Sequence, residues 1–353
     1  MSFPSAVAPP PAARRVPMWF WLVLALVVVL LLAAGITATV LLVRRFGGGP
    51  VKGDVAYTLR VTGKDGAAAD AGAVERTRTL LLDRLRRLGV GRPNVTAVGP
   101  DTLKVTAAHE DADRVRSVLS PGNLTFRLAT AQTMARPTDQ PGGDCKSGAQ
   151  APASADSPLA SARQKLGESV YQAAAALTGP EDPKAAQLQG FDRLSCAEIA
   201  ALPPAMQFAV PAITCAMLNR RPAGALPNDA GVTACGDSVK YRLDAAKATG
   251  ADVEDAEAAL NKDIGRWTVI IRFTPSGQDR WAALTEEALH QQVAILVDDE
   301  VVSAPTIQAV ITGDAEISGG SLDTKDAASA LAVTLGSGAL PAQVTITATD
   351  TVG

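Results

Sequence analysis

The sequence predicts an α+β protein that begins with a single transmembrane helix. Three observations support this prediction: a long run without charged residues near the N-terminus, an alternation of strand-like and helix-like segments after it, and a second such alternation near the C-terminus. Between the two alternating regions lies a stretch rich in Pro, Gly and Ser that also holds the cysteines. We therefore expect two structured regions separated by an irregular insertion.

The composition is that of an ordinary globular protein and excludes some classes of function. The 353 residues include 33 basic and 36 acidic side chains, so no basic surface for nucleic acid is expected. The two histidines, His109 and His290, lie far apart and have no cysteine or histidine at metal-ligand spacing, which predicts no metal site. No group of residues resembles a catalytic site, so we expect neither an enzyme nor a cofactor.

The N-terminal part predicts a membrane anchor. Residues 1–16 are rich in Pro and Ala and should form a disordered tail. Residues 17–43 carry no charge, and about 20 apolar residues in a helix suffice to cross a bilayer. Trp19 and Trp21 lie where the lipid interface would be. The alternative, a cleaved signal peptide, has an apolar region of only about 7–15 residues.

Arginines flank the anchor on both sides, so the distribution of positive charge does not predict its orientation. The cysteines do predict it. The four cysteines are Cys145, Cys196, Cys215 and Cys235. An even number without histidine partners predicts two disulfides in an oxidising compartment, so the tail is expected to be cytoplasmic and the main body extracytoplasmic. We expect the pairs Cys215–Cys235 and Cys145–Cys196, because the first pair flanks a short loop rich in Pro, Asn and Gly. The alternative is four reduced thiols in a cytoplasmic domain.

A compact α+β unit is predicted for residues 54–129, after a glycine-rich linker at 44–53. Its expected elements are strand 55–61, helix 74–88, strands 95–98 and 103–107, helix 110–119, and strand 124–128. The order βαββαβ is that of the ferredoxin-like fold.

Helix 74–88 is expected to be amphipathic. Its apolar face is formed by Leu80, Leu81, Leu85 and Leu88, and its polar face by Arg76, Arg78, Arg84 and Arg87. Such a pattern predicts that the leucines pack on the sheet and that the arginines face solvent.

Residues 130–262 show little periodicity and are predicted to form an irregular insertion with disulfides, apart from a helix within 161–177. Regular structure is expected again over residues 263–340. The predicted elements are strand 268–273, a helix that begins near residue 274, strands 293–297 and 301–303, and helix 323–335. A strand within 341–353 is expected to return to the first unit.

The turn between strands 293–297 and 301–303 contains three consecutive acids, Asp298, Asp299 and Glu300. Side chains of consecutive turn residues point in different directions, whereas a calcium loop places acids at alternating positions. We therefore expect these acids to face solvent and to bind no metal.

Several short motifs carry a resemblance to a known family. They are Leu88-Gly-Val90, Leu124-Thr-Phe-Arg127, Ala294-Ile-Leu-Val-Asp298, Val301-Val-Ser-Ala-Pro305, Ile311-Thr-Gly313 and Gly338-Ala-Leu-Pro341. Their order and spacing resemble the first extracytoplasmic domain of SecD, the accessory subunit of the Sec protein-export machine. The resemblance implies that residues 54–129 form the base, that 263–340 form the head subdomain, and that 341–353 return to the base.

The chain departs from SecD in three respects. The Asp-Gly-Gly motif that follows the first membrane helix of SecD has no counterpart at 48–54, and the Arg-Val-Asn run on the first helix is Arg84-Leu-Arg86 here. SecD also continues into five more membrane helices that carry its proton pathway. The helix expected at 17–43 holds no ionisable residue, so we expect no proton-driven transport from this chain alone.

The resemblance implies a role in export. The SecD head engages the emerging polypeptide on the outer face of the membrane and swings relative to its base. The expected partners are therefore the Sec translocon or a SecD–SecF complex, unfolded exported polypeptide, and the lipid bilayer through residues 17–43. The alternative is a structural or scaffold protein of the envelope that has no role in export.

A polypeptide without fixed sequence is best bound by backbone pairing at the edge of a sheet. The candidate edge is formed by Val301, Val302, Pro305, Ile307 and Val310, because Pro305 cannot donate to a strand ladder and so marks an edge. The alternative is that Val302, Ile307 and Val310 are buried in the core, since apolar β-branched residues are usually buried.

Overall fold

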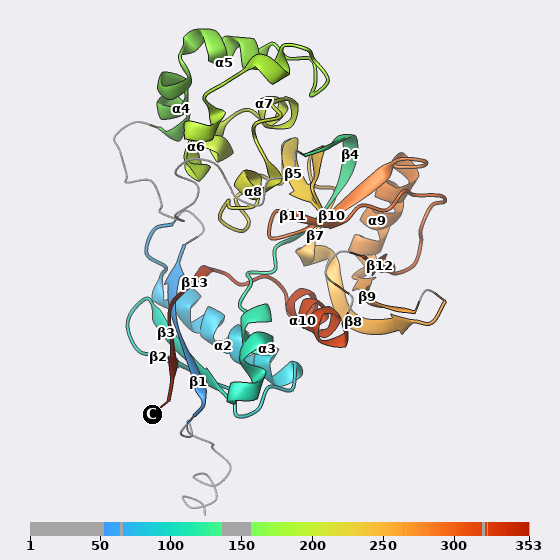
Figure 1. Cartoon of the computed structure of the whole chain (residues 1–353). Helices are drawn as coiled ribbons and strands as arrows, with labels where there is room; N and C mark the ends of the chain where they lie inside the picture. Colours follow the sequence, from blue (N-terminus) through green and yellow to red (C-terminus); the bar gives the residue numbers. More distant parts are fainter. Residues whose placement is uncertain are drawn as a thin grey trace, which may run out of the picture. The chain divides into compact units, whose positions relative to one another are not determined.

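The computed structural model describes residues 53–352, except for 64–65, 136–156, 264, 320–321 and 323 (Figure 1). The division of the chain lies between Val51 and Lys52, and the described residues all belong to the part Lys52–Gly353. The first sheet and the two helices packed on it are called the first unit below. The expected tail 1–16, the anchor 17–43 and nearly all of the linker 44–53 lie outside the described residues. Within the described part, no helix is long and apolar enough to cross a membrane. This part is a mixed α+β structure with three sheets.

The first sheet has four strands in the order β13-β1-β3-β2, and all neighbours are antiparallel. The strands are β1 (Val55–Thr62), β2 (Asn94–Ala97), β3 (Thr102–Ala107) and β13 (Gln343–Thr351). The strand expected to return near the C-terminus is β13, which pairs with β1 from Thr62 opposite Gln343 to Val55 opposite Thr351.

Two helices pack on the first sheet, α2 (Ala71–Arg87) and the short α3 (Ala112–Ser117). The helix α2 begins where the carboxylate of Asp70 accepts a hydrogen bond from the amide of Ala73, at 2.8 Å, which satisfies one of the free amides of the first turn. Leu81 and Leu85 are fully buried against Leu59 and Leu103 of the sheet. These leucines form the core of the unit, as expected for an amphipathic helix.

The expectation that residues 124–128 close the first sheet is wrong. They begin β4 (Leu124–Met134), which belongs to the second sheet. In a βαββαβ order, the strand after the second helix would lie beside β1, but β13 occupies that place. The sequence order does not distinguish these two strands, because either is apolar enough and long enough to pair with β1.

The second sheet closes into a ring. Its strands are β4, β5 (Val232–Gly236), β6 (Val239–Leu243), β7 (Ala248–Thr249), β10 (Gln292–Val297) and β11 (Glu300–Ser303). They are ordered β10-β11-β5-β6-β4-β7, and β10 also pairs with β4. The five strands β4, β6, β5, β11 and β10 therefore form a closed circuit, with one parallel pair at β5 and β11. Closure of this kind leaves few free edges.

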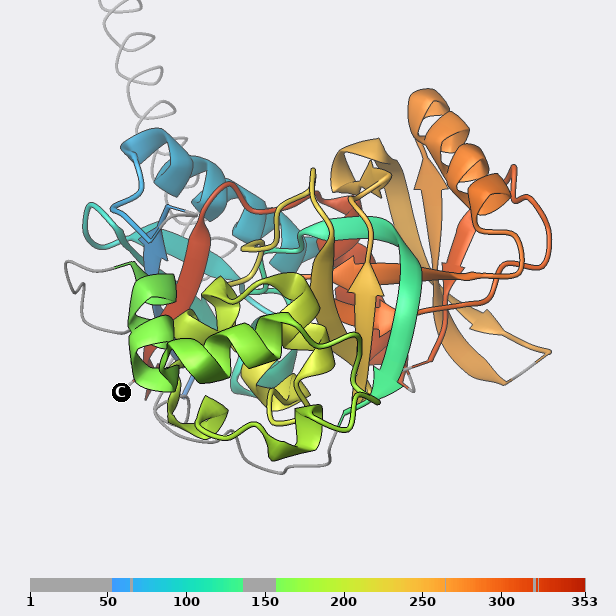
Figure 2. The same ribbon diagram turned by 90° about the horizontal axis from the view of Figure 1, so that it is seen from above.

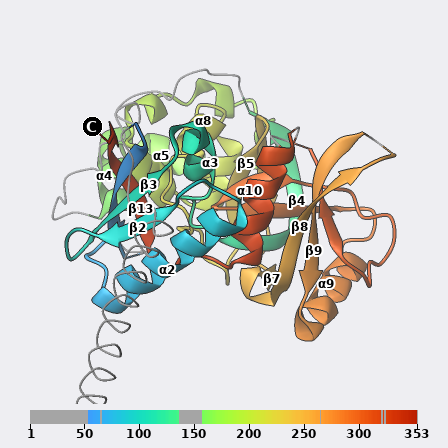
Figure 3. The same ribbon diagram turned by 90° about the horizontal axis from the view of Figure 1, so that it is seen from below.

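The third sheet has three antiparallel strands in the order β12-β9-β8, which are β8 (Val253–Asn261), β9 (Arg266–Phe273) and β12 (Ala315–Ile317). It packs with α9 (Pro275–Glu287) and α10 (Lys325–Gly336) around an aromatic cluster. In this cluster the rings of Phe126, Phe273 and Trp281 lie 5.3–5.5 Å apart between centroids. Figure 3 shows α10 beside α2 and α3 of the first unit.

The expected boundary of the insertion at residue 262 is also wrong. Strands β5 and β6 belong to the ring, and β8 pairs with β9 from Val253 to Asn261. The strand β8 consists largely of Ala, Glu and Asp, which have low β propensity, so its sequence does not indicate a strand. Its long pairing with the β-branched residues of β9 outweighs this local preference.

The expectation of an irregular insertion is wrong for residues 157–218 too. They form the helices α4 (Pro158–Leu166), α5 (Glu168–Ala175), α6 (Cys196–Ala201), α7 (Pro204–Ala209) and α8 (Cys215–Leu218). Gly167, at φ +76°, separates α4 from α5 where one helix was expected. The helices share a core of their own, which includes Phe191, Leu194 and Ile199. Figure 2 shows them (green) gathered together, away from α9 and its sheet (orange). Helices of four to nine residues are too short to show a clear period.

Candidate functional site

The turn between β10 and β11 holds two neighbouring segments in place. The carboxylate of Asp298 accepts hydrogen bonds from the amides of Gly122 and Asn123, at 3.0 and 2.9 Å, and from the hydroxyl of Ser120. Both Asp298 and Asp299 have positive φ, 52° and 71°, as a two-residue hairpin turn requires. The expectation that these two acids face solvent is therefore wrong, because backbone amides of adjacent segments bind them.

Asp299 binds the segment that precedes β5. Its carboxylate accepts hydrogen bonds from the amides of Ala225 and Leu226, at 2.7 and 3.1 Å. Burial raises the pKa of Asp299, although the two amides and the nearby charge of Arg221 act in the opposite direction. Glu300, the third acid, is exposed as expected.

Arg84 joins the two segments that connect the first unit to the rest of the chain. It lies on α2, and its side chain is fully buried. Its guanidinium donates hydrogen bonds at 2.5–3.4 Å to the carbonyls of Val118, Ser120, Pro121, Thr334 and Gly338 and to the hydroxyl of Ser337. Burial lowers the pKa of Arg84 to about 10. The expectation that Arg84 faces solvent is wrong.

The segments that Arg84 binds are 118–123, between α3 and β4, and 334–341, between α10 and β13. A backbone hydrogen bond of 2.8 Å from Leu340 to Pro121 joins the same two segments directly. The chain enters the ring through 118–123 and returns from the last turn of α10 to the first sheet through 334–341. Arg84 binds both segments, and Asp298 binds the first of them.

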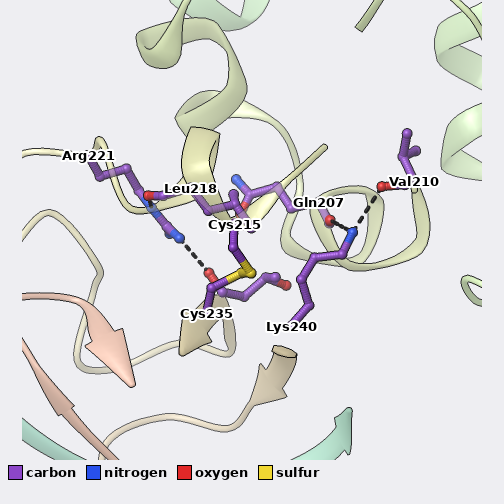
Figure 4. Close-up of a disulfide and its surroundings, with 8 residues drawn as sticks. Gln207, Val210, Cys215, Leu218, Arg221, Cys235 and Lys240 are labelled. Carbon is purple, nitrogen blue, oxygen red and sulfur yellow. Dashed lines mark hydrogen bonds between the residues drawn. A yellow bond between two sulfur atoms is a disulfide. The ribbon is translucent and has the colours of Figure 1, made fainter. Parts of the chain in front are cut away.

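The helices α7 and α8 are attached to the ring by a disulfide and by two buried cations (Figure 4). Cys215 of α8 is bonded to Cys235 of β5, with Cα atoms 5.4 Å apart, which is the pair expected from the sequence. Arg221 donates to the carbonyls of Leu218 and Thr233, both at 2.8 Å. Burial lowers the pKa of Arg221 to about 10.

Lys240 of β6 lies beside the end of α7. Its ammonium donates to the carbonyls of Gln207 and Val210, at 3.0 and 2.9 Å, where a helix C-terminus has free carbonyls. Burial lowers its pKa to about 8. Cys196 is disulfide-bonded as well, but Cys145 lies outside the described residues, so the pair Cys145–Cys196 stays a prediction.

The candidate edge is not a continuous edge. Val301 and Ile307 are buried, Val302 is half-buried, and Pro305 and Val310 are exposed. Strand β11 lies between β10 and β5, so its backbone is paired on both sides. The alternative interpretation, that Val302, Ile307 and Val310 are core, agrees with the burial of Ile307 but not with the exposure of Val310. Pro305 does not mark an edge of β11, because it follows the strand in a connecting segment.

Part of the candidate set nevertheless lines a cavity. Val301 and Val302 contribute to a pocket of about 350 Å³ that is also lined by residues of α10 and of the turn between β5 and β6. Val310, another member of the set, is 43% exposed. Leu289, which forms a β-bridge with Ile307, is 38% exposed. Exposed apolar residues and a partly apolar pocket on one subdomain are typical of a surface that binds other molecules.

The described residues offer no metal centre. Among them, no three His, Cys, Asp or Glu side chains gather closely enough to hold an ion.

The sequence analysis missed the roles of Arg84 and of the Asp298–Asp299 turn. A signal for Arg84 was present, because it lies three residues after Leu81 and four before Leu88, on the apolar face of α2. No comparable signal marks the turn, since its partners lie far away in the sequence.

Comparison with known proteins gives a family match for part of this structure. The model of the SecDF P1 head subdomain matches residues 231–342, which contain β5 to β12, α9 and α10. The SecD subunit of the protein translocase from Elusimicrobium minutum is 43% identical over 107 residues, which are 30% of this chain and 22% of that protein. The corresponding subunit from Streptomyces coelicolor is 42% identical over 130 residues, which are 33% of this chain and 22% of that protein.

The matched segments thus span less than a quarter of the length of these curated relatives. The structure can be superposed on a crystal structure of SecDF in its super-membrane-facing form. The superposition covers 84% of this chain and 30% of the SecDF chain, with a TM-score of 0.48 and 21% sequence identity. By sequence, residues 231–342 are similar to the SecDF P1 head subdomain, and about a third of the chain is similar to SecD subunits of the protein translocase.

Proposed function

We propose that this protein is a non-enzymatic accessory of protein export that binds unfolded polypeptide on the outer face of the membrane. The observation that supports it most is the match of residues 231–342 to the SecDF P1 head subdomain, together with relatives that are subunits of the protein translocase. The match covers only 22% of the length of those relatives, so a shared activity and shared partners are part of this proposal.

The geometry of the matched region suits this role. The segments that follow α9 and β11 carry the exposed apolar residues Leu289 and Val310, and a pocket lies beside Val301 and Val302 of β11. An export factor must bind polypeptides of many different sequences. Shallow apolar contacts of this kind suit that task, because they do not depend on a fixed sequence. The buried contacts of Arg84 and Asp298 hold the ring on the first unit, so that a load on one is transmitted to the other.

The proposed location follows from the anchor and the cysteines. Residues 17–43 would span the bilayer with the tail 1–16 in the cytoplasm and the body outside. The disulfide between Cys215 and Cys235 is consistent with an oxidising compartment. In this position the protein would lie beside the Sec translocon or a SecD–SecF complex.

A direct test compares one exported precursor in two states. The full-length protein in nanodiscs is mixed with a fluorescent precursor that is either kept unfolded or already folded, and binding is followed by fluorescence anisotropy. We expect binding of the unfolded form and little binding of the folded form. Equal binding of both forms, or binding of folded envelope proteins alone, would favour the scaffold alternative and contradict the proposal.

A further inference from the structure

A pocket with two acids at its mouth lies where four elements meet. Residues of α3, α10, β11 and the turn between β5 and β6 line this cavity of about 350 Å³. Two of the lining residues, Asp237 and Glu300, are exposed acids, whereas Val301 and Leu331 are buried or half-buried and apolar. The pocket therefore combines a charged mouth with an apolar wall.

The backbone fixes the positions of the two acids. Asp237 lies in the two-residue turn between β5 and β6 at φ +47°, and Glu300 is the first residue of β11. Glu300 pairs with Cys235 in the parallel contact of β11 with β5. At the next residue, Gly236, a Cβ atom would overlap the carbonyl of Val301, so the two strands are in direct contact there. Both acids are thus held by strands and not by a long loop.

The charge of the two acids is not neutralised within the described part of the chain. No ion pair joins Asp237 or Glu300 to a described lysine or arginine. Asp237 and Glu300 line the same pocket, so two like charges lie near each other. Partial burial and the charge of Asp237 raise the pKa of Glu300, although a hydrogen bond with Asn219 acts in the opposite direction. A cation between them would remove this repulsion.

The wall of the pocket indicates which cation fits. Val302 and Leu331 offer apolar surface, and the hydroxyl of Thr334 is buried without a hydrogen-bond partner among the described residues. A bare metal ion would need more ligands than two carboxylates. A lysine or arginine side chain instead places its apolar stem on such a wall and its charged end near carboxylates.

We propose that this pocket receives a lysine or arginine side chain of the bound polypeptide. The inference rests on the proposed function and adds a preference to it: among unfolded polypeptides, those with basic residues bind more tightly. The apolar contacts at Leu289 and Val310 would remain available to any sequence.

The test uses two unfolded peptides that differ only in charge. The first peptide contains several lysines and arginines. The second peptide has the same sequence, but its lysines and arginines are replaced by the neutral analogues acetyl-lysine and citrulline. Binding to the full-length protein in nanodiscs of neutral lipid is measured by fluorescence anisotropy. We expect the charged peptide to bind about tenfold more tightly, which corresponds to about 1.4 kcal/mol.

The double variant Asp237→Asn, Glu300→Gln should bind both peptides equally, at the affinity of the wild type for the neutral one. Asn tolerates positive φ as well as Asp does, and Gln keeps the length of Glu, so the melting temperature should not fall. The matched control is Glu254→Gln, Asp314→Asn, which removes two exposed acids away from the pocket and should keep the tenfold preference.

The outcomes separate the two proposals. If the wild type binds both peptides equally, the pocket proposal is wrong and the proposed function stands. If the pocket variant keeps the preference, or the control variant loses it, the acids of the pocket are not its cause. If the wild type binds neither peptide, both proposals are contradicted.

Discussion

At the scale of single residues, four buried cations hold the segments of this protein together. Arg84, Arg127, Arg221 and Lys240 are all nine-tenths buried or more, and all donate to backbone carbonyls. A buried cation with several carbonyl acceptors fixes the distance between the segments that supply them. Apart from the position of Arg84 on the apolar face of α2, their sequence positions give little sign of this role, because lysines and arginines are usually exposed.

Replacing Arg84 tests the most connected of these cations. The variant Arg84→Met keeps a long apolar stem but removes the donor from the carbonyls of Val118 and Gly338. Because each buried unpaired group costs about 1–3 kcal/mol, the free energy of unfolding should fall by roughly 3 kcal/mol or more. Urea denaturation followed by circular dichroism measures it. Arg86→Met, at an exposed position of the same helix, should change it by less than about 0.5 kcal/mol. Equal losses in both variants would contradict this role of Arg84.

Lys240 predicts a pH dependence of stability. Its pKa is about 8 in the folded protein, whereas an unfolded chain keeps the ordinary value near 10.5. Above pH 8 the unfolded state therefore binds more protons, so the free energy of unfolding should rise with pH, by at most about 1.4 kcal/mol per unit. Below pH 8 this contribution is constant.

Urea denaturation between pH 7 and 9 measures this slope and stays below the pKa of about 10 to which burial lowers Arg84 and Arg221. Lys240→Met removes the amine, and the loss of its hydrogen bonds adds an offset that does not depend on pH. We expect the slope to flatten in this variant. An unchanged slope would show that Lys240 does not titrate in this range.

At the scale of elements, the closure of the ring depends on one parallel contact, between β5 and β11. Gly236 allows it, because any side chain at this position would meet the carbonyl of Val301. Gly236→Ala should therefore separate the two strands and lower the free energy of unfolding by roughly 2 kcal/mol. Gly313→Ala is the control, since a Cβ there meets no atom within 4 Å. Thermal unfolding of both variants measures the effect, and similar melting temperatures would refute the close contact.

The strands themselves were easier to predict than their partners. The alternation in residues 55–61 and 103–107 and the leucines of α2 predict elements that the structure contains, because their periods are local. A strand within 341–353 was expected to return to the first unit, as β13 does, but its place beside β1 could not be predicted. Residues 124–128, which belong to β4, also suit that place, and only the tertiary fold distinguishes the two strands. The helices α4 to α8 were missed because each spans only one to three turns.

At the scale of the whole molecule, the SecD-like motifs predicted more about function than the composition did. A net charge of -3 excludes a nucleic-acid surface, but it does not reveal that Asp237 and Glu300 lie together at one pocket. Those two residues are 63 positions apart in sequence (300 minus 237), so only the ring of strands brings them together. Of the candidate edge, Val310 is exposed and Val302 is half-buried, but the sequence did not reveal that β11 is paired on both sides.

Crosslinking in living cells tests the central claim, that the matched subdomain touches polypeptides during export. A photoreactive amino acid replaces Val310, which is 43% exposed, and as a control Val98, which is 57% exposed in the turn after β2. After irradiation, the crosslinked proteins are identified by mass spectrometry. We expect secreted precursors in an unfolded state to be linked at position 310 and to be absent or rare at position 98. Crosslinks from position 310 only to folded envelope proteins, or equal yields at both positions, would contradict a role in export.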